Sequence, residues 1–249
     1  MNDETHLFQS LQFLLSPPHP CSYLSDQEAS TLFVDPKANM DMMTYQRLSR
    51  AGFRRSGEYV YRPHCQACNK CVPVRIPVAQ FSPNRSQRRS WKKNQDLQLR
   101  VLDAAYQDEH FALYRRYMQA RHPGGGMDNE DPDAYRRVIS AQWSESSLFE
   151  FRLNGTLLAV AVVDVGIDGL SAVYTFFAPE AAHRSLGCFA VLSQVAEARQ
   201  RDLHWVYLGY WNQDSPKMAY KTDYHPLEYF DGQQWGAQVP SCKISVNSF

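Results

Sequence analysis

The chain lacks the features that mark membrane and secreted proteins. No run approaches the roughly 18 apolar residues that cross a bilayer, and the polar residues 1–6 lack the apolar segment of a signal peptide. Six cysteines in 249 residues, three of them clustered, do not resemble a secreted disulfide framework. Repeats, low-complexity tracts and regular histidine spacings are also missing. These absences predict a soluble cytoplasmic protein with no membrane contact.

Acidic side chains are almost missing from residues 47–100. This segment has Glu58 and Asp96 as its only acids, but it holds thirteen of the 26 Lys and Arg residues. The remainder of the chain therefore carries thirteen basic and twenty-four acidic side chains, so the formal net charge of zero conceals a strong separation of charge. A clustered basic face attracts polyphosphate even on a neutral protein. The segment predicts a nucleic-acid partner.

The densest part of this segment reads as a short basic helix that begins at Ser82-Pro83. Its cations suit backbone phosphates, and Trp91 suits an unstacked base. The alternative is a solvated helix face, which most charge runs are. The candidate nucleic-acid contacts on this helix are Arg85, Arg88, Arg89, Lys92 and Lys93.

The three clustered cysteines have the spacing of a metal-binding loop. In Cys65-x-x-Cys68-x-x-Cys71 a tight loop can turn several thiolates toward one ion, and Cys21 or His64 can supply a fourth ligand. The same spacing resembles part of an iron–sulfur run. The cysteines are therefore candidate ligands for zinc or an iron–sulfur cluster. The other interpretation is a set of small buried hydrophobic side chains.

The order of predicted elements indicates an α+β fold. Residues 58–62 and 72–78 read as strands on either side of the cysteines, and two prolines in the second favour an edge strand. A flexible loop at residues 122–127 forms the clearest internal break. Beyond it we expect strands at 148–153, 157–165 and 170–177, a helix at 187–201 and a strand at 204–208. The predicted domains are 1–105, with the cysteines and the basic segment, and 106–249.

Two further segments are candidates for substrate contact. Arg184 and Ser185 precede a helix, where backbone N–H groups can hold phosphate. This loop partly resembles the acyl-CoA loop of N-acetyltransferases, but Phe189 stands where that loop needs a small residue. Aromatic and lysine residues then crowd together after the last predicted strand. They predict a pocket wall, or else core aromatics with snorkelling lysines, and are Tyr207, Tyr210, Trp211, Lys217, Met218, Tyr220 and Lys221.

Taken together, segments along nearly the whole chain resemble the bacterial aspartate/glutamate leucyltransferases, relatives of the arginyl-tRNA–protein transferases. In the first half the resemblance rests on Pro20-Cys21-Ser22-Tyr23-Leu24, Gly52-Phe53-Arg54-Arg55-Ser56-Gly57, Tyr61-Arg62-Pro63-His64-Cys65 and Cys71-Val72-Pro73-Val74-Arg75-Ile76-Pro77-Val78. In the second half it rests on Tyr174-Thr175-Phe176-Phe177, Arg184-Ser185-Leu186-Gly187, Tyr207-Leu208-Gly209-Tyr210-Trp211 and Lys217-Met218-Ala219-Tyr220-Lys221.

The resemblance implies transfer of leucine from leucyl-tRNA to the α-amine of proteins that begin with Asp or Glu. The new N-terminal leucine would mark those proteins for degradation by the N-end rule. It also implies an N-terminal domain joined to an acetyltransferase-like (GNAT-type) domain with an antiparallel or mixed sheet. Because an aminoacyl ester is already activated, we expect transfer to need no cofactor, whatever the cysteines bind.

The chemistry needs a proton acceptor for the amine and a cation for the acidic acceptor. Candidate proton-transfer groups are Tyr174, Tyr207, Tyr210, Asp164 and the vicinal hydroxyl of the tRNA. Backbone N–H groups between splayed strands are candidates to hold the oxyanion. Candidate acceptor-binding residues are Arg75, Lys217, Met218, Tyr220 and Lys221, with Arg54 or Arg55 as alternatives for the cation.

Three other functions stay open at this point. The first keeps the chemistry and changes the donor to arginyl-tRNA. The second is a CoA-dependent N-acetyltransferase, and the third is a non-catalytic RNA-binding module with a metal knuckle at residues 65–71.

Overall fold

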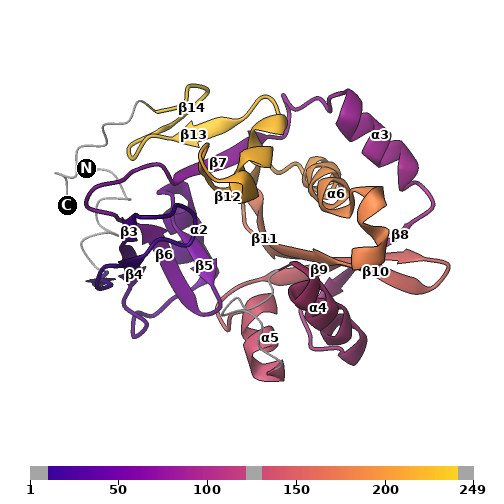
Figure 1. The fold of residues 1–249 in the computed structure, drawn as a ribbon, viewed down its shortest axis with the longest axis horizontal. Helices are drawn as coiled ribbons and strands as arrows, with labels where there is room; N and C mark the ends of the chain where they lie inside the picture. The colour runs from indigo at the N-terminus through magenta and orange to yellow at the C-terminus, as the bar shows by residue number, and fades with distance from the viewer. Residues whose placement is uncertain (1–10, 122–130, 241–249) are drawn as a thin grey trace.

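The computed structural model describes residues 11–121 and 131–240 (Figure 1). The loop expected at residues 122–127 lies outside the described residues. Within them the chain is α+β, as predicted, with one large mixed sheet and a smaller antiparallel one. No described helix has both the length and the apolar character needed to span a bilayer.

The small sheet and one helix form a unit of their own near the N-terminus. The sheet has the order β1-β4-β6-β5 and is antiparallel throughout. Asp41 caps the helix α2 by accepting a hydrogen bond from the Thr44 amide at 2.7 Å. Apolar side chains from the helix and the strands close a core of Val34, Tyr45, Leu48, Phe53 and Val60. The elements are β1 (Phe13–Leu15), β4 (Thr31–Val34), α2 (Met42–Arg50), β5 (Arg54–Ser56) and β6 (Tyr59–Pro63), with a separate pair β2 (His19–Pro20) and β3 (Glu28–Ala29).

The large sheet has eight strands in the order β14-β13-β7-β12-β11-β10-β9-β8. The predicted meander is confirmed: β9 and β10 form a hairpin, β10 pairs antiparallel with β11, and β11 pairs parallel with β12 after the helix α6. The strands are β7 (Val72–Pro77), β8 (Gln98–Asp103), β9 (Ser146–Leu153), β10 (Thr156–Val165), β11 (Gly169–Phe177), β12 (Trp205–Trp211), β13 (Glu228–Phe230) and β14 (Trp235–Gly236).

The edge position expected for residues 72–78 is wrong. β7 lies inside the large sheet, between β12 and β13. Its prolines are tolerated because β13 pairs only with Val74 and Arg75, so Pro73 and Pro77 have no partner strand on that side. The large sheet thus includes β7 and β8 from one side of the boundary expected at residues 105/106 and six strands from the other.

Helices cover both faces of the large sheet (Figure 1). α6 (Leu186–Gln200) lies on one face, with α3 (Arg85–Lys93) packed outside it, and α4 (Asp108–Arg121) and α5 (Pro132–Ile139) lie on the other. The basic helix begins at Arg85 rather than at Pro83, because Asn84 and Gln87 form a capping box. Three short helices complete the chain: η1 (Pro179–Arg184), α7 (Pro216–Ala219) and η2 (Tyr220–Asp223).

Candidate active site and nucleic-acid interface

Two neighbouring parallel strands of the large sheet separate partway along their length. Residues Gly169–Ser171 of β11 pair with Trp205–Tyr207 of β12. The pairing ends there, although β11 continues to Phe177 and β12 to Trp211. On its other side β12 has a register shift between Tyr207 and Gly209, where Gly209 takes a φ of +82°. Backbone groups of both strands are therefore released from the parallel ladder beyond this point, as expected for splayed strands.

A buried amine lies against the released part of β12. The turn η2 folds back so that Lys221 Nζ donates a hydrogen bond to the Tyr210 carbonyl. A Cβ atom on Gly209 would lie 3.7 Å from this Nζ, so the glycine also faces the amine. Burial and the nearby Arg54 guanidinium lower the pKa of Lys221 from 10.5 to about 7. The amine is therefore partly uncharged near neutral pH.

The other candidate acceptor-binding residues lie apart from this amine or are already engaged. Arg75 Nε donates to Glu228 Oε2 at 2.9 Å, and the guanidinium lies over the rings of Trp205 and Trp235 at 3.5 and 4.3 Å. Its charge therefore has a carboxylate partner within the chain. Lys217 is exposed, and Met218 is buried in the short helix α7.

Tyr220, the neighbour of Lys221, is half exposed and presents its ring at the surface.

The three tyrosines that are candidates for proton transfer are held by protein partners. Tyr210 Oη is within hydrogen-bond distance of the Gly52 and Tyr61 carbonyls, at 2.9 and 3.0 Å, and so joins β12 to the small unit. Tyr207 Oη accepts from Arg75, and Tyr174 Oη contacts Met118 Sδ at 3.3 Å. Burial raises the pKa of all three phenols.

Asp164 forms a buried ion pair that residue spacing could not reveal. Its two carboxylate oxygens accept hydrogen bonds from Arg55 Nε and Nη2 at 2.6 and 2.7 Å, and Ser146 Oγ donates to it at 2.7 Å. Both ionic side chains are fully buried. The carboxylate is therefore engaged with groups from β5 and β9.

The residue next to Arg55 has no such partner. Arg54 is only 6% exposed, and its Nη1 donates to the Ser49 and Phe53 carbonyls at 3.2 and 2.6 Å. Its Nε and Nη2 are buried without a hydrogen-bond partner among the described residues. The guanidinium lies 5.0 Å from the centre of the Tyr207 ring, at the position where β11 and β12 part. The sequence offered Arg54 only as an alternative to other cations.

The candidate metal ligands line a cavity of about 150 Å³. All four cysteines line its wall: Cys21 follows β2, and Cys65, Cys68 and Cys71 lie between β6 and β7. In the described part of the chain, however, no three His, Cys, Asp or Glu side chains are grouped closely enough to hold a metal ion. Burial raises the pKa of Cys71 to about 11.

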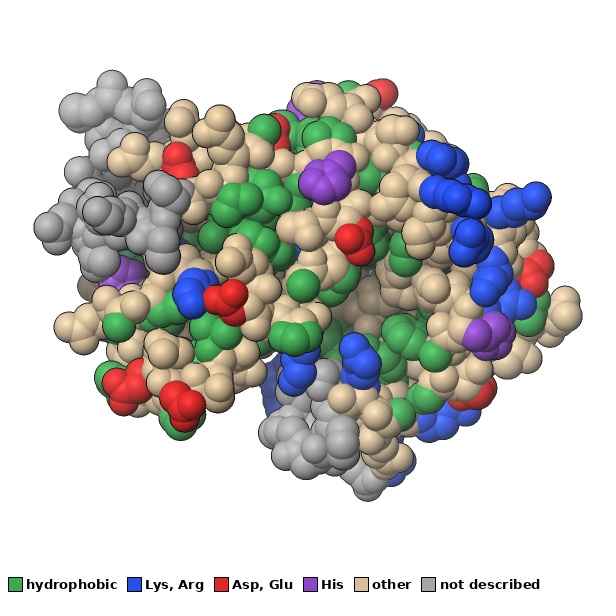
Figure 2. Space-filling view, turned by 45° about the horizontal axis from the view of Figure 1, so that its top comes forward, with side chains coloured by type: hydrophobic (Ala, Val, Ile, Leu, Met, Phe, Trp, Pro, Cys, Tyr) green, Lys and Arg blue, Asp and Glu red, His purple; other side chains and the backbone are tan. Residues whose placement is uncertain are grey.

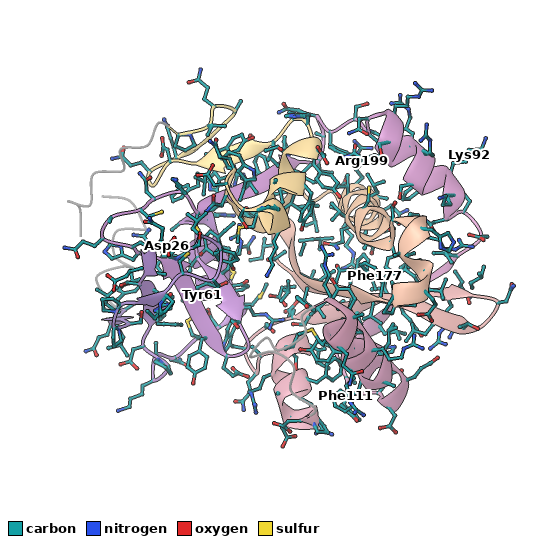
Figure 3. The ribbon with its side chains drawn as sticks, viewed as in Figure 1. Asp26, Tyr61, Lys92, Phe111, Phe177 and Arg199 are labelled. Atoms are coloured by element: carbon teal, nitrogen blue, oxygen red, sulfur yellow. The ribbon has the colours of Figure 1, made fainter. Side chains whose placement is uncertain are left out.

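The side chains of α3 form a basic surface. Gln87, Ser90 and Asn94 face inward, whereas the five cations point outward. Figure 2 shows Lys and Arg side chains gathered along this edge, and Figure 3 shows Lys92 pointing away from the body of the protein. Trp91 is 37% exposed and packs on Phe189, with ring centres 5.3 Å apart.

The structure brings Arg184 and Ser185 to this same helix. The Arg184 and Ser185 carbonyls accept hydrogen bonds from Asn94 Nδ2 and Ser90 Oγ, at 2.9 and 3.3 Å. The Arg184 guanidinium forms two hydrogen bonds of 2.9 Å with Asp96. Segments nearly 100 residues apart thus lie side by side, and the charge of Arg184 has a carboxylate partner within the chain.

The described chain is an α+β protein in which a buried amine lies at two separating strands, and an exposed basic helix packs on the same sheet's covering helix. Two family models match the sequence: "Arginine-tRNA-protein transferase, N terminus" over residues 19–89, and the C terminus of the same family over residues 109–231. The chain belongs to the arginine-tRNA-protein transferase family.

Its relatives include proteins named aspartate/glutamate leucyltransferase. The one from Nitrosococcus oceani is 54% identical over 92% of this chain and 96% of its own length. The one from Pseudomonas fluorescens is 51% identical over 90% and 96%, respectively. Among solved structures, L-PGS from Bacillus licheniformis is similar with a TM-score of 0.42 and 12% identity, over 84% of this chain and 71% of that one. That last likeness is too loose to bear on function.

Proposed function

We propose that the chain transfers leucine from leucyl-tRNA to the α-amine of proteins that begin with Asp or Glu. The name and the full-length similarity of the relatives support this donor and these acceptors. Family membership implies that the added leucine directs the protein to degradation by the N-end rule. Because charged tRNA is a cytoplasmic substrate, we assign the reaction to the cytoplasm.

The reaction is aminolysis of an ester. The acceptor nitrogen forms a bond to the leucyl carbonyl carbon, the bond from that carbon to the ribose oxygen breaks, and the ribose oxygen takes a proton. Since the ester is already activated, the main task of the protein is to hold the two reactants in attack geometry, which contributes roughly 7–11 kcal/mol. We therefore assign no cofactor to the transfer.

The separation of β11 from β12 is the observation that carries the proposal. Released backbone N–H groups of the two strands are placed to stabilise the oxyanion that forms at the leucyl carbonyl. An acetyltransferase-like domain is expected to contain two parallel strands that diverge and are joined by a helix, and β11, α6 and β12 form such a unit. In this proposal the ester enters between the strands.

Lys221 is our candidate for the group that accepts the proton from the acceptor amine. Its amine lies at the Tyr210 carbonyl, beyond the last residue of β12 that pairs with β11. A base is most effective when its pKa is near the working pH, and the lowered pKa of Lys221, about 7, meets this condition. The Asp164 carboxylate and the Tyr210 hydroxyl are bound by protein groups instead.

We assign binding of the tRNA backbone to the basic surface of α3. Arg85, Arg89 and Lys92 are exposed and have no carboxylate partner among the described side chains. Their position on a helix packed against α6 places the tRNA on the same side of the sheet as that helix. Phosphate contacts of this kind hold the nucleic acid without reading its sequence.

The test mixes the purified protein with tRNA carrying labelled leucine or labelled arginine, and with peptides that begin with Asp, Glu, Asn or Ala. We expect label to pass from leucyl-tRNA to the Asp and Glu peptides. Transfer from arginyl-tRNA alone would keep the chemistry and change the donor. No transfer from either, with tRNA still bound, would overturn the catalytic proposal.

A further inference from the structure

Arg54 and Arg55 are neighbours on β5, and the Nε and Nη2 edges of their guanidinium groups have different surroundings. Arg55 uses Nε and Nη2 together to bind both oxygens of Asp164. The equivalent two groups of Arg54 are buried and meet no acceptor within the described chain. This edge is the one that fits a carboxylate with two parallel hydrogen bonds. Arg54 therefore carries an unfilled binding edge of the kind that Asp164 fills on Arg55.

A second buried basic side chain, Lys221, lies beside it. Burial and, after it, the charge of Arg54 lower the pKa of Lys221. Neither Arg54 nor Lys221 forms an ion pair with a described carboxylate, whereas the other two buried arginines, Arg55 and Arg75, each pair with one. Buried polar groups without partners are rare in folded proteins, so each one requires an explanation. Arg54 and Lys221 together therefore favour the binding of an anion.

We propose that the Nε and Nη2 edge of Arg54 binds the side-chain carboxylate of the acceptor's first residue and so selects Asp and Glu. This assignment rests on the proposed function. The Arg54 guanidinium lies over Tyr207, the last β12 residue that pairs with β11. A carboxylate held there lies near the point where β11 and β12 part.

The charge at this site explains the choice of acceptor. Asn and Gln have nearly the shape of Asp and Glu but lack the negative charge, so they leave the buried Arg54 guanidinium without a counter-charge. Truncating one partner of a buried charged pair is costly because the other charge stays behind. Arg54 therefore controls how strongly the protein prefers a peptide that begins with Asp or Glu over one that begins with Asn or Gln.

The experiment compares Arg54→Met with the wild-type protein on peptides that begin with Asp or Asn. We expect the ratio of the two kcat/KM values to fall at least tenfold, through loss of transfer to the Asp peptide, with affinity for leucyl-tRNA unchanged. Added methylguanidinium should restore part of the ratio in Arg54→Ala. An unchanged ratio in a folded Arg54→Met protein would overturn the assignment. A purely structural role would lower transfer to both peptides equally and would also overturn it.

The double change Arg55→Met with Asp164→Leu is the matched control, because it removes the neighbouring guanidinium together with the carboxylate that occupies its edge and so leaves no buried charge. Its Asp to Asn ratio should equal that of the wild-type protein. Calorimetric titration of the two peptides without tRNA separates this inference from the proposed function. If the wild-type protein transfers no leucine but binds the Asp peptide through Arg54, the function fails and the anion site stands. If the protein transfers leucine but binds the Asp peptide equally well without Arg54, the proposed function stands and the anion site fails.

Discussion

Arg55 and Asp164 lie 109 residues apart in sequence and form a two-point ion pair that is closed to solvent. Because β5 supplies one partner and β10 the other, the pair fastens the small N-terminal unit to the large sheet. Removing one member of such a pair leaves a buried charge, which costs about 3–5 kcal/mol.

We therefore predict that Arg55→Met lowers the free energy of unfolding by about this amount. The double change Arg55→Met with Asp164→Leu should recover most of the loss, because no charge remains buried. Urea unfolding of the single and double variants checks both statements. Equal destabilisation by the two would show that the ion pair does not hold the units together.

Charge reversal on α3 should act on tRNA binding alone. The triple change Arg85→Glu, Arg89→Glu and Lys92→Glu is expected to weaken binding and to reduce the slope of log affinity against log salt by about 2–3, because each lost phosphate contact removes roughly 0.7–0.9. Filter binding across a salt series measures the slope. The triple change Arg116→Glu, Arg136→Glu and Arg137→Glu, on α4 and α5 at the opposite face of the sheet, makes the same change in net charge and is the control. A slope unchanged from the wild type would place the tRNA elsewhere.

Replacing Lys221 by Met should stabilise the fold in a pH-dependent way. The pKa of this lysine falls from 10.5 to about 7 on folding, so between these values the unfolded chain binds the proton and the folded chain does not. Stability therefore rises with pH across this window. The gain from Lys221→Met should be largest below pH 7, on the order of a few kcal/mol, and should vanish near pH 10.5. Urea unfolding at pH 6 and 9 tests this, with Lys217→Met as the exposed control.

The same substitution should slow the chemical step. If Lys221 accepts the proton, the single-turnover rate of the wild-type protein rises with pH through about 7, and Lys221→Met reduces the plateau by about 10²–10⁴-fold. Two peptides whose α-amines have different pKa values separate the enzyme's inflection from that of the substrate. An inflection that follows the peptide and survives the substitution would assign the proton transfer to another group.

The local elements of this fold were predictable because their signals are local. The turn at Asn154-Gly155 and the alternating residues on either side indicated the hairpin of β9 and β10, which the structure confirms. The interior position of β7 was not predictable, since its partners β12 and β13 follow more than 120 residues later. Prolines suggested an edge, and the shortness of β13 removed the conflict.

The site shows the same limit. A dense group of aromatic and lysine residues indicated where Lys221 would lie, but neighbouring letters could not tell which cation already had a partner. Arg54 and Arg55 look alike in sequence, yet Asp164 lies within reach of only one. Arg75 looked free until the structure placed Glu228 beside it. Partners distant in sequence decide which charges remain available.

The place of β7 in the sheet has a consequence for synthesis on the ribosome. Its neighbour β12 is made about 130 residues later, which at about 5–20 residues per second leaves an apolar strand waiting for roughly 6–26 seconds. By the start of that interval the buried core residues of the small N-terminal unit, which lie between Val34 and Val60, have all been made. The nascent chain therefore carries an open strand edge beside a finished unit, and this interval is when we expect chaperones to hold it.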